Sequence, residues 1–305
     1  MSKDNVVSTI AQGTVIAAFG RQYAVRLDTG GEALCYPRAK RSEIACGDRV
    51  EMALNAPDQG VIDKILPRAS LFYRADQWKE KLIAANVTQI VVVVATEPGF
   101  SDELITRCMV AADAQDIAAL IVLNKSDIPA SLEACRAQLK AFVAAGHAVL
   151  EMSAMGDVEP LRERLRDHTS LFVGQSGMGK STLTNALIPD ADARTREISE
   201  VLDSGKHTTT HARLYALPGG GQLIDSPGLQ SFGLAHLTKN EIECGFPEIR
   251  PLLGTCRFRD CNHLKEPDCA LRGARDSGEF DARRYTALMQ LLDEHEVARK
   301  HRLEH

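Results

Sequence analysis

The sequence predicts an α/β protein whose parallel sheet follows a small β-barrel and precedes a helical segment. Three observations predict this architecture. Residues 13–66 contain short β-rich stretches, apolar strands alternate with alanine-rich helical stretches after Pro67, and the strands stop at about residue 237. A chain of 305 residues is long enough for two or three such units. We expect them to span residues 1–69, 70–236 and 237–305.

The first unit is predicted to be a closed or sandwiched β structure. Its expected strands are residues 23–27, 33–36, 49–54 and 61–66. Asp28-Thr29-Gly30-Gly31 predicts a hairpin between the first two, because glycine adopts positive φ without a Cβ clash. Several short strands with such turns favour an OB-like barrel, with another small barrel or a sandwich as the alternative.

The middle unit is predicted to be a largely parallel sheet with helices between its strands. Its expected buried strands are residues 90–95, 119–123, 148–152, 170–173, 213–217 and 222–224. Beyond the sheet, residues 283–303 have the pattern of a polar amphipathic helix.

Composition excludes some classes of protein. Hydrophobic content of 44% and charged content of 25% are ordinary for a globular protein. The longest apolar run, residues 90–95, is too short to cross a bilayer, and the N-terminus lacks the apolar core of a signal peptide, so we expect a cytoplasmic protein without membrane contact. We also expect a monomer, although the sequence itself does not fix the oligomeric state. With a net charge of −5, any contact with RNA requires a local basic patch. Arg38-Ala39-Lys40-Arg41 is one candidate, and a solvated loop is the alternative.

A phosphate-binding loop follows the strand at residues 170–173. The segment GxxxxGKS places glycines, a lysine and a serine between a strand and a helix. The backbone N–H groups of such a loop face phosphates, the lysine neutralises their charge and the serine ligates Mg²⁺. The predicted nucleotide-contacting residues are Gly174, Gln175, Ser176, Gly177, Met178, Gly179, Lys180, Ser181 and Thr182.

Residues that read a guanine base follow two other strands. Asn124-Lys125-Ser126-Asp127 comes after the strand at residues 119–123. The Asp127 carboxylate can accept hydrogen bonds from guanine N1–H and its N2 amino group, a donor pair that adenine lacks. Lys125 can lie along the base, and Asn124 can tie neighbouring loops together. Ser153-Ala154 follows the strand at residues 148–152 and resembles the loop whose backbone N–H contacts guanine O6.

The γ-phosphate sensors are predicted after the phosphate loop. Asp225-Ser226-Pro227-Gly228 offers a carboxylate for the Mg²⁺ shell and a backbone N–H for the γ-phosphate. Asp28-Thr29-Gly30-Gly31 matches the same DxxG pattern, so only the preceding strand and the distance from the phosphate loop distinguish the two. Thr208, Thr209 and Thr210 can close over Mg²⁺, and we favour Thr209.

These motifs occur in a rotated order, because the base-reading segments precede the phosphate loop instead of following it. The sequence resembles the RsgA (YjeQ) family of circularly permuted GTPases in NKSD, GQSGMGKS, GKHTTT, DSPG and its C-terminal cysteines. The resemblance covers nearly the whole chain. It implies a circularly permuted P-loop GTPase domain that binds GTP and GDP with Mg²⁺. It also implies a role in maturation of the bacterial small subunit, with the 30S subunit and its 16S rRNA as partners.

Three cysteines and a histidine cluster near the C-terminus. Cys256, Cys261, His263 and Cys269 lie within fourteen residues. Three thiolates and one imidazole fill the tetrahedral shell of a structural zinc ion, and a chain without a signal peptide is expected to use clustered cysteines as metal ligands. We expect one zinc and a zinc-binding helical module.

The sequence offers one candidate for the group that orients the attacking water. Leu229 stands where many GTPases have glutamine, so intrinsic hydrolysis should be slow. His207 is our candidate, and a plain surface histidine is the alternative. Two other functions compete with a ribosome-dependent GTPase: an RNA-binding scaffold with structural GTP and no turnover, and a P-loop kinase, against which NKSD argues.

Overall fold

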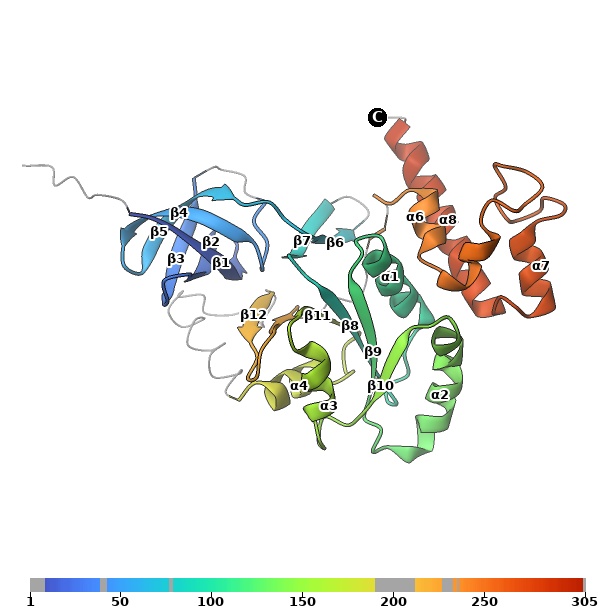
Figure 1. The fold of residues 1–305 in the computed structure, drawn as a ribbon, viewed down its shortest axis with the longest axis horizontal. Coiled ribbons are helices and arrows are strands. Elements are labelled where there is room, and N and C mark those ends of the chain that lie inside the picture. Colours follow the sequence, from blue (N-terminus) through green and yellow to red (C-terminus); the bar gives the residue numbers. More distant parts are fainter. Residues whose placement is uncertain are drawn as a thin grey trace, which may run out of the picture.

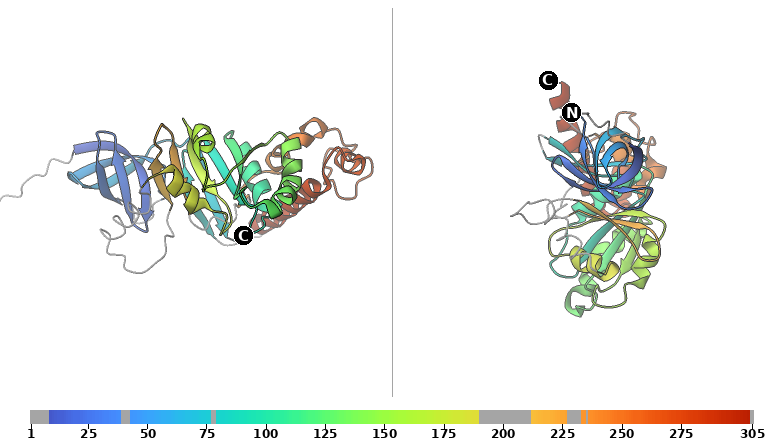
Figure 2. Two further views of the ribbon diagram at one scale, coloured as in Figure 1. Left: turned by 90° about the horizontal axis from the view of Figure 1, so that it is seen from below. Right: turned by 90° about the vertical axis from the view of Figure 1, so that its left-hand side faces the viewer.

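The computed structural model describes residues 9–38, 43–76, 79–189, 212–226, 233–234 and 236–303. Within these residues, the strands form an eleven-stranded sheet and a separate two-stranded hairpin. Figures 1 and 2 show three parts in a row: the barrel, the α/β part and the helical C-terminal part. The exact boundaries of the three units stay a prediction.

The N-terminal strands close into a barrel. They are β1 (Thr9–Phe19), β2 (Gln22–Leu27), β3 (Glu32–Pro37), β4 (Arg49–Ala56) and β5 (Gln59–Ile65). Their order is β1-β2-β3-β5-β4, and β4 pairs back onto β1. Fully buried side chains such as Val15, Val25 and Met52 fill the interior. This closed five-stranded arrangement confirms the predicted OB-like barrel.

The central part contains the predicted, mostly parallel sheet. Its strands are β8 (Gln89–Ala95), β9 (Ala118–Asn124), β10 (Ala148–Glu151), β11 (Thr169–Val173), β12 (Arg213–Ala216) and β13 (Gln222–Asp225). Their order is β10-β9-β8-β11-β13-β12, and only the pairing of β12 with β13 is antiparallel. All six strands lie within a few residues of their predicted positions.

Strand β8 shows why the sequence has an uninterrupted apolar run here. Every residue of β8 is buried because both faces of the sheet are covered. Val92 and Val94 pack in the core that includes α1 (Asp102–Asp113) and α2 (Pro129–Ala144). Val91 and Val93 face the core of the other side, whose helices are α3 (Glu159–Leu165) and α4 (Lys180–Leu187).

A hairpin that the sequence did not predict lies between the barrel and β8. It consists of β6 (Leu71–Asp76) and β7 (Lys79–Ala85). The barrel contacts this hairpin through an isolated bridge between Cys46 and Ala84, and it contacts the central sheet through the pairing of Ala17 in β1 with Arg213 in β12. The barrel is therefore hydrogen-bonded directly to the α/β part.

The C-terminal part consists of short helices and one long helix. They are α6 (Lys239–Cys244), the 3₁₀ helix η1 (Pro247–Leu252), α7 (Ala270–Ser277) and α8 (Ala282–Leu303). The last confirms the predicted helix over residues 283–303. Among the described residues, no helix combines the length and apolar character needed to cross a membrane.

A buried arginine joins this part to the α/β part. Arg284 of α8 is only 2% exposed, and its guanidinium lies over the rings of Phe142 and Phe246 at 4.8 and 4.5 Å. Its Nε donates to Glu248 at 2.7 Å. Because Phe142 belongs to α2 and Phe246 precedes η1, one side chain packs the two parts together.

Candidate nucleotide-binding site and metal cluster

Four of the predicted motifs follow parallel strands of one sheet. Strands β9, β10, β11 and β13 end just before or at the segments that begin with Asn124, Ser153, Gly174 and Asp225. The carboxyl ends of parallel strands lie at the same edge, and ligands of open α/β sheets bind there. The fold therefore gathers segments that lie up to a hundred residues apart in the sequence.

The phosphate loop connects β11 to α4. Gly177 and Gly179 have φ values of +83° and +89°, which side chains with a Cβ rarely adopt. Lys180 is nearly buried, and its Nζ donates to the carbonyl oxygens of Gly174 and Gln175 at 2.6 and 2.8 Å. Ser181 and Thr182 are exposed at the start of α4. The loop thus presents its ammonium and helix N-terminus in the arrangement that phosphate binding requires.

Asn124 joins three loops. Its side chain is buried, its Nδ2 donates to the carbonyl of Met178 at 2.9 Å, and its Oδ1 accepts from the Ala154 N–H at 2.9 Å. This is the cross-loop role expected for Asn124. The Ala154 N–H therefore already has a partner here, so a contact with guanine O6 would have to compete with Asn124.

Lys125 connects the base-reading segment to the phosphate loop. Its Nζ donates to the Gly177 carbonyl at 2.8 Å and to the Glu97 carbonyl at 2.6 Å. Asp127 is exposed, and within the described part of the chain no hydrogen bond to its carboxylate is recorded. Its oxygens are therefore available to accept from a base.

Asp225 lies close enough to Lys180 for their charges to interact. Its Oδ2 accepts from the Thr184 hydroxyl at 3.4 Å. Burial raises the pKa of Asp225, and the charge of Lys180 opposes that rise. Burial also lowers the pKa of Lys180, and the negative charge of Asp225 opposes this decrease. Opposite charges thus share partly dehydrated surroundings, where electrostatic interactions are stronger than in water.

The remaining predicted residues of this site lie outside the described part of the chain. They are His207, Thr209, its neighbours Thr208 and Thr210, and Gly228. The structure also places two partners here that the sequence reasoning missed, Glu97 and Thr184. Glu97 contributes a backbone carbonyl, for which no residue type is a signal. Thr184 lies one helical turn after Lys180 and so shares its face of α4, which is a usable signal.

The Cys/His cluster has the geometry of a metal centre. The ligand atoms of Cys256, Cys261, His263 and Cys269 all lie within 4.8 Å of one another. His263 Nδ1 is 3.6 Å from Cys256 Sγ and 3.4 Å from Cys269 Sγ, and these two sulfurs are 3.9 Å apart. A tetrahedral zinc ion places two sulfurs about 3.8 Å apart and a sulfur and a nitrogen about 3.6 Å apart. The four residues therefore fit a tetrahedral ion.

Replacing Gly179 with alanine should weaken nucleotide binding. A Cβ at this position would lie 2.3 Å from Asn124 Nδ2 and would also strain a φ of +89°. We expect affinity for a fluorescent GDP analogue to fall about 10- to 100-fold. Gly146→Ala is the matched control, because φ is +90° there and no atom lies within 4 Å of the added carbon. The control should lose about 1 kcal/mol of stability and no nucleotide affinity. Equal nucleotide affinities for both variants would contradict the role given to the contact between Asn124 and the phosphate loop.

The fold and the site define a P-loop GTPase whose nucleotide-binding motifs are circularly permuted. The RsgA GTPase family model matches residues 65–235. The chain belongs to the RsgA GTPase family and is a GTP hydrolase.

Curated relatives match nearly the whole chain. The small ribosomal subunit biogenesis GTPase RsgA of Paraburkholderia phytofirmans is 52% identical over 297 residues, which covers 94% of each chain. That of Ralstonia nicotianae is 51% identical and covers 95% of this chain and 93% of the relative.

Two solved structures share the fold. YjeQ from Thermotoga maritima is 28% identical with a TM-score of 0.71, and the match covers 94% of this chain and 99% of that one. YloQ, described as a circularly permuted GTPase, is 26% identical with a TM-score of 0.68, covering 97% and 98%.

Proposed function

We propose that this protein binds the small ribosomal subunit and assists its late maturation in the cytoplasm, hydrolysing GTP to GDP and phosphate with ribosome stimulation. The main support for the GTP site is the pair of hydrogen bonds made by Asn124, which joins its own base-reading segment to Met178 of the phosphate loop and to Ala154 of the second base-reading loop. The curated relatives, which are named small ribosomal subunit biogenesis GTPases, support the partner. Their names argue against a scaffold that never hydrolyses GTP.

Each residue around the base has a distinct proposed role. Asp127 accepts from guanine N1–H and the N2 amino group, while Lys125 lies along the base and stays tied to the phosphate loop. Asn124 holds the three loops in register. Ser153 and Ala154 complete the wall of the base pocket.

The phosphate side stabilises the charge that develops on the transferred group. Lys180 exchanges its bonds to the Gly174 and Gln175 carbonyls for phosphate oxygens, and the loop N–H groups stabilise the same charge. Mg²⁺, when bound, supplies a Lewis acid that neutralises the β- and γ-phosphates. Ser181 and Asp225 are its proposed direct and water-mediated contacts. Thr209 as a metal ligand, Gly228 as a γ-phosphate contact and His207 as the water-orienting group remain proposals.

The flanking parts are the proposed contacts with 16S rRNA. An OB-like barrel is a recurrent nucleic-acid-binding fold. The basic stretch at residues 38–41 belongs to the barrel's longest connection, between β3 and β4. Because the net charge is −5, these contacts must be local.

Single-turnover GTP hydrolysis with added 30S, 50S or 70S particles tests the proposed function. We expect slow hydrolysis by the protein alone and a marked acceleration by 30S subunits. Bound GTP that is never hydrolysed, with or without 30S, would favour the scaffold. Equal acceleration by 50S subunits would contradict the assigned partner.

We also propose that the metal centre holds one structural zinc ion. Three cysteines and a histidine leave no open coordination position, so the ion stabilises the fold and takes no part in hydrolysis. Because residues 253–269, which carry the four ligands and are all described, form no helix or strand, the ion supplies cohesion that this segment cannot provide by itself.

Removing the zinc should destabilise the C-terminal part. We expect elemental analysis to find one zinc per chain and a strong chelator to lower the thermal midpoint by roughly 5–10 °C, as several kcal/mol of binding energy are lost. Cys269→Ser should lose the metal, whereas Cys244→Ser, at a half-buried thiol outside the cluster, should keep it. Full zinc content in Cys269→Ser would contradict the proposed ligand set.

A further inference from the structure

We propose that Glu243 is a positioning residue of the metal centre: it holds the His263 ring so that Nδ1 faces the thiols, and it thereby makes helix α6 part of the centre. The inference rests on the proposed zinc site but concerns a residue outside the four ligands. Glu243 lies in α6, before the cysteine-rich segment, and the Cys/His spacing gives no indication of it.

The two ring nitrogens of His263 have different partners. Nε2 lies 3.1 Å from Glu243 Oε1, while Nδ1 lies 3.4 Å from Cys269 Sγ. A carboxylate oxygen beside Nε2 fits the tautomer in which Nε2–H donates the hydrogen bond. A neutral imidazole then has its lone pair on Nδ1, which is the atom that faces the sulfurs. The geometry therefore assigns Nδ1 as the metal-binding atom, with the carboxylate as its outer partner.

The contact between His263 and Glu243 is shielded from water. His263 is 6% exposed and Glu243 is 8% exposed, so water can substitute little for either partner. A buried carboxylate requires compensation, and the ring N–H provides one partner. Removing the carboxylate would leave the buried Nε2–H without its acceptor and remove the contact that orients this side of the ring.

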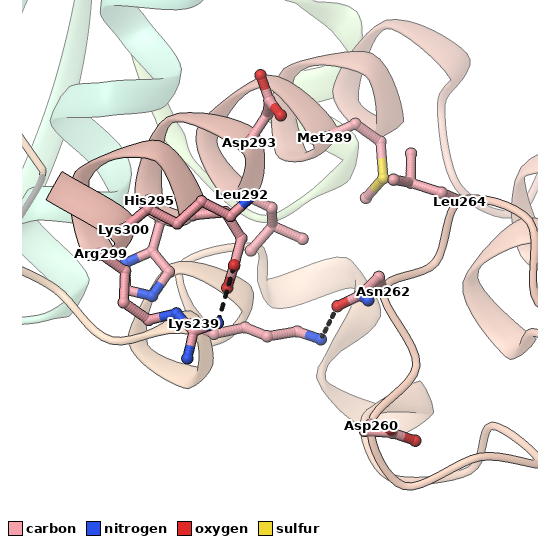
Figure 3. A pocket seen from close by; sticks show the side chains of 11 residues that line it. Lys239, Asp260, Asn262, Leu264, Met289, Leu292, Asp293, His295, Arg299 and Lys300 are labelled. Carbon is pink, nitrogen blue, oxygen red and sulfur yellow. Dashed lines mark hydrogen bonds and ion pairs between the residues drawn. The ribbon is translucent and has the colours of Figure 1, made fainter. Parts of the chain in front are cut away.

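Lys239, from the same helix, contacts both the Glu243 carboxylate and the segment at residues 261–262. Lys239 Nζ lies 3.7 Å from Glu243 Oε1, and it also donates to the Cys261 carbonyl and, at 3.3 Å, to Asn262 Oδ1. Figure 3 shows Lys239 reaching across to Asn262. Both residues line a hollow of about 490 Å³, whose other walls come from residues 260–264 and α8. Helix α6 thus contacts both a metal-binding histidine and the backbone of a metal-binding cysteine.

The backbone of His263 is held by a second helix. The Tyr285 hydroxyl of α8 donates to the His263 carbonyl. The backbone of His263 has a φ of +62°, a conformation that a residue with a Cβ adopts at some cost. The ring is therefore fixed by Glu243 while its backbone is fixed by α8, so the centre connects α6 to α8 through one residue.

Zinc affinity of purified full-length variants, measured by competition with a chromophoric chelator, tests the inference. Glu243→Ala should bind zinc about 10- to 100-fold more weakly than the wild type. Glu243→Gln keeps an oxygen acceptor without the charge and should fall between them. Asp260→Asn is the matched control, because this exposed carboxylate precedes Cys261 and lies outside the contact to His263, so its affinity should be unchanged.

Long-range ¹H–¹⁵N spectra of the zinc-loaded wild type supply a second, independent readout. They should show His263 with a protonated Nε2 and a metal-bound Nδ1. Metal bound through Nε2, or wild-type affinity in a folded Glu243→Ala variant, would overturn the inference. If Glu243→Ala does not fold, the spectrum of the wild type alone decides. A wild type that binds no zinc would instead refute the proposed zinc site.

Discussion

Replacing Lys180 with alanine is expected to lower GTP turnover by about 10³-fold, because it removes the only cationic side chain within residues 174–181, the phosphate loop. The lysine is nearly buried and its Nζ lies between the Gly174 and Gln175 carbonyls, so its charge is positioned before the nucleotide arrives. Electrostatic interactions in such a partly dehydrated site are stronger than in water, so once Lys180 contacts phosphate oxygens it stabilises their developing charge strongly. Its loss also leaves the Asp225 carboxylate without the cation that opposes the rise of its pKa.

Single-turnover hydrolysis at saturating GTP, with and without 30S subunits, measures this effect. Lys140→Ala is the control, since this lysine is exposed on α2. The control should retain wild-type turnover. A Lys180→Ala variant that is folded and hydrolyses GTP within about threefold of the wild type would show that phosphate charge is neutralised elsewhere.

Local chemistry explains why much of the fold and the site could be predicted. Strand β8 is buried on both faces, so its valine run is visible without knowledge of its neighbours. The phosphate loop is equally local, because its glycines, lysine and helix start all lie within one short segment. The rotated motif order also becomes physically reasonable, since β11 lies between β8 and β13 and all the loops emerge at one sheet edge whatever their sequence order.

Long-range contacts account for what the sequence did not predict. The two residues between β6 and β7 in the sequence, Gln77 and Trp78, are neither glycine nor asparagine, so the usual hairpin signal is missing. The pairing of Ala17 with Arg213 joins segments nearly two hundred residues apart, and no local pattern encodes it. In the nucleotide-binding site, Asn124 was predictable as a link between loops because an amide offers both a donor and an acceptor. In the Cys/His cluster, the role of Glu243 was not predictable, because it depends on where the His263 ring lies in the fold.

Exchanging Asp127 for asparagine should change the base that the site prefers from guanine to xanthine. Guanine presents two adjacent donors, N1–H and the N2 amino group, to which a carboxylate is complementary. Xanthine keeps N1–H but has a carbonyl oxygen at position 2. The amide side chain that D127N introduces can accept from N1–H and donate to that oxygen, whereas toward guanine its N–H₂ group would face another donor.

The expected result is a loss of GTP affinity of about 10²- to 10³-fold, with xanthosine triphosphate becoming the tighter ligand and supporting hydrolysis. The substitution should not disturb the fold, because the Asp127 carboxylate is exposed and makes no hydrogen bond or ion pair within the described residues. Asp116→Asn serves as the control: this exposed residue lies before β9, at the opposite sheet edge, and its φ of +52° suits asparagine. Titrations of both variants with both nucleotides measure the change. If D127N bound GTP as tightly as the wild type, another residue would have to read the base, and the convergence of the loops on a guanine nucleotide would lose its chemical basis.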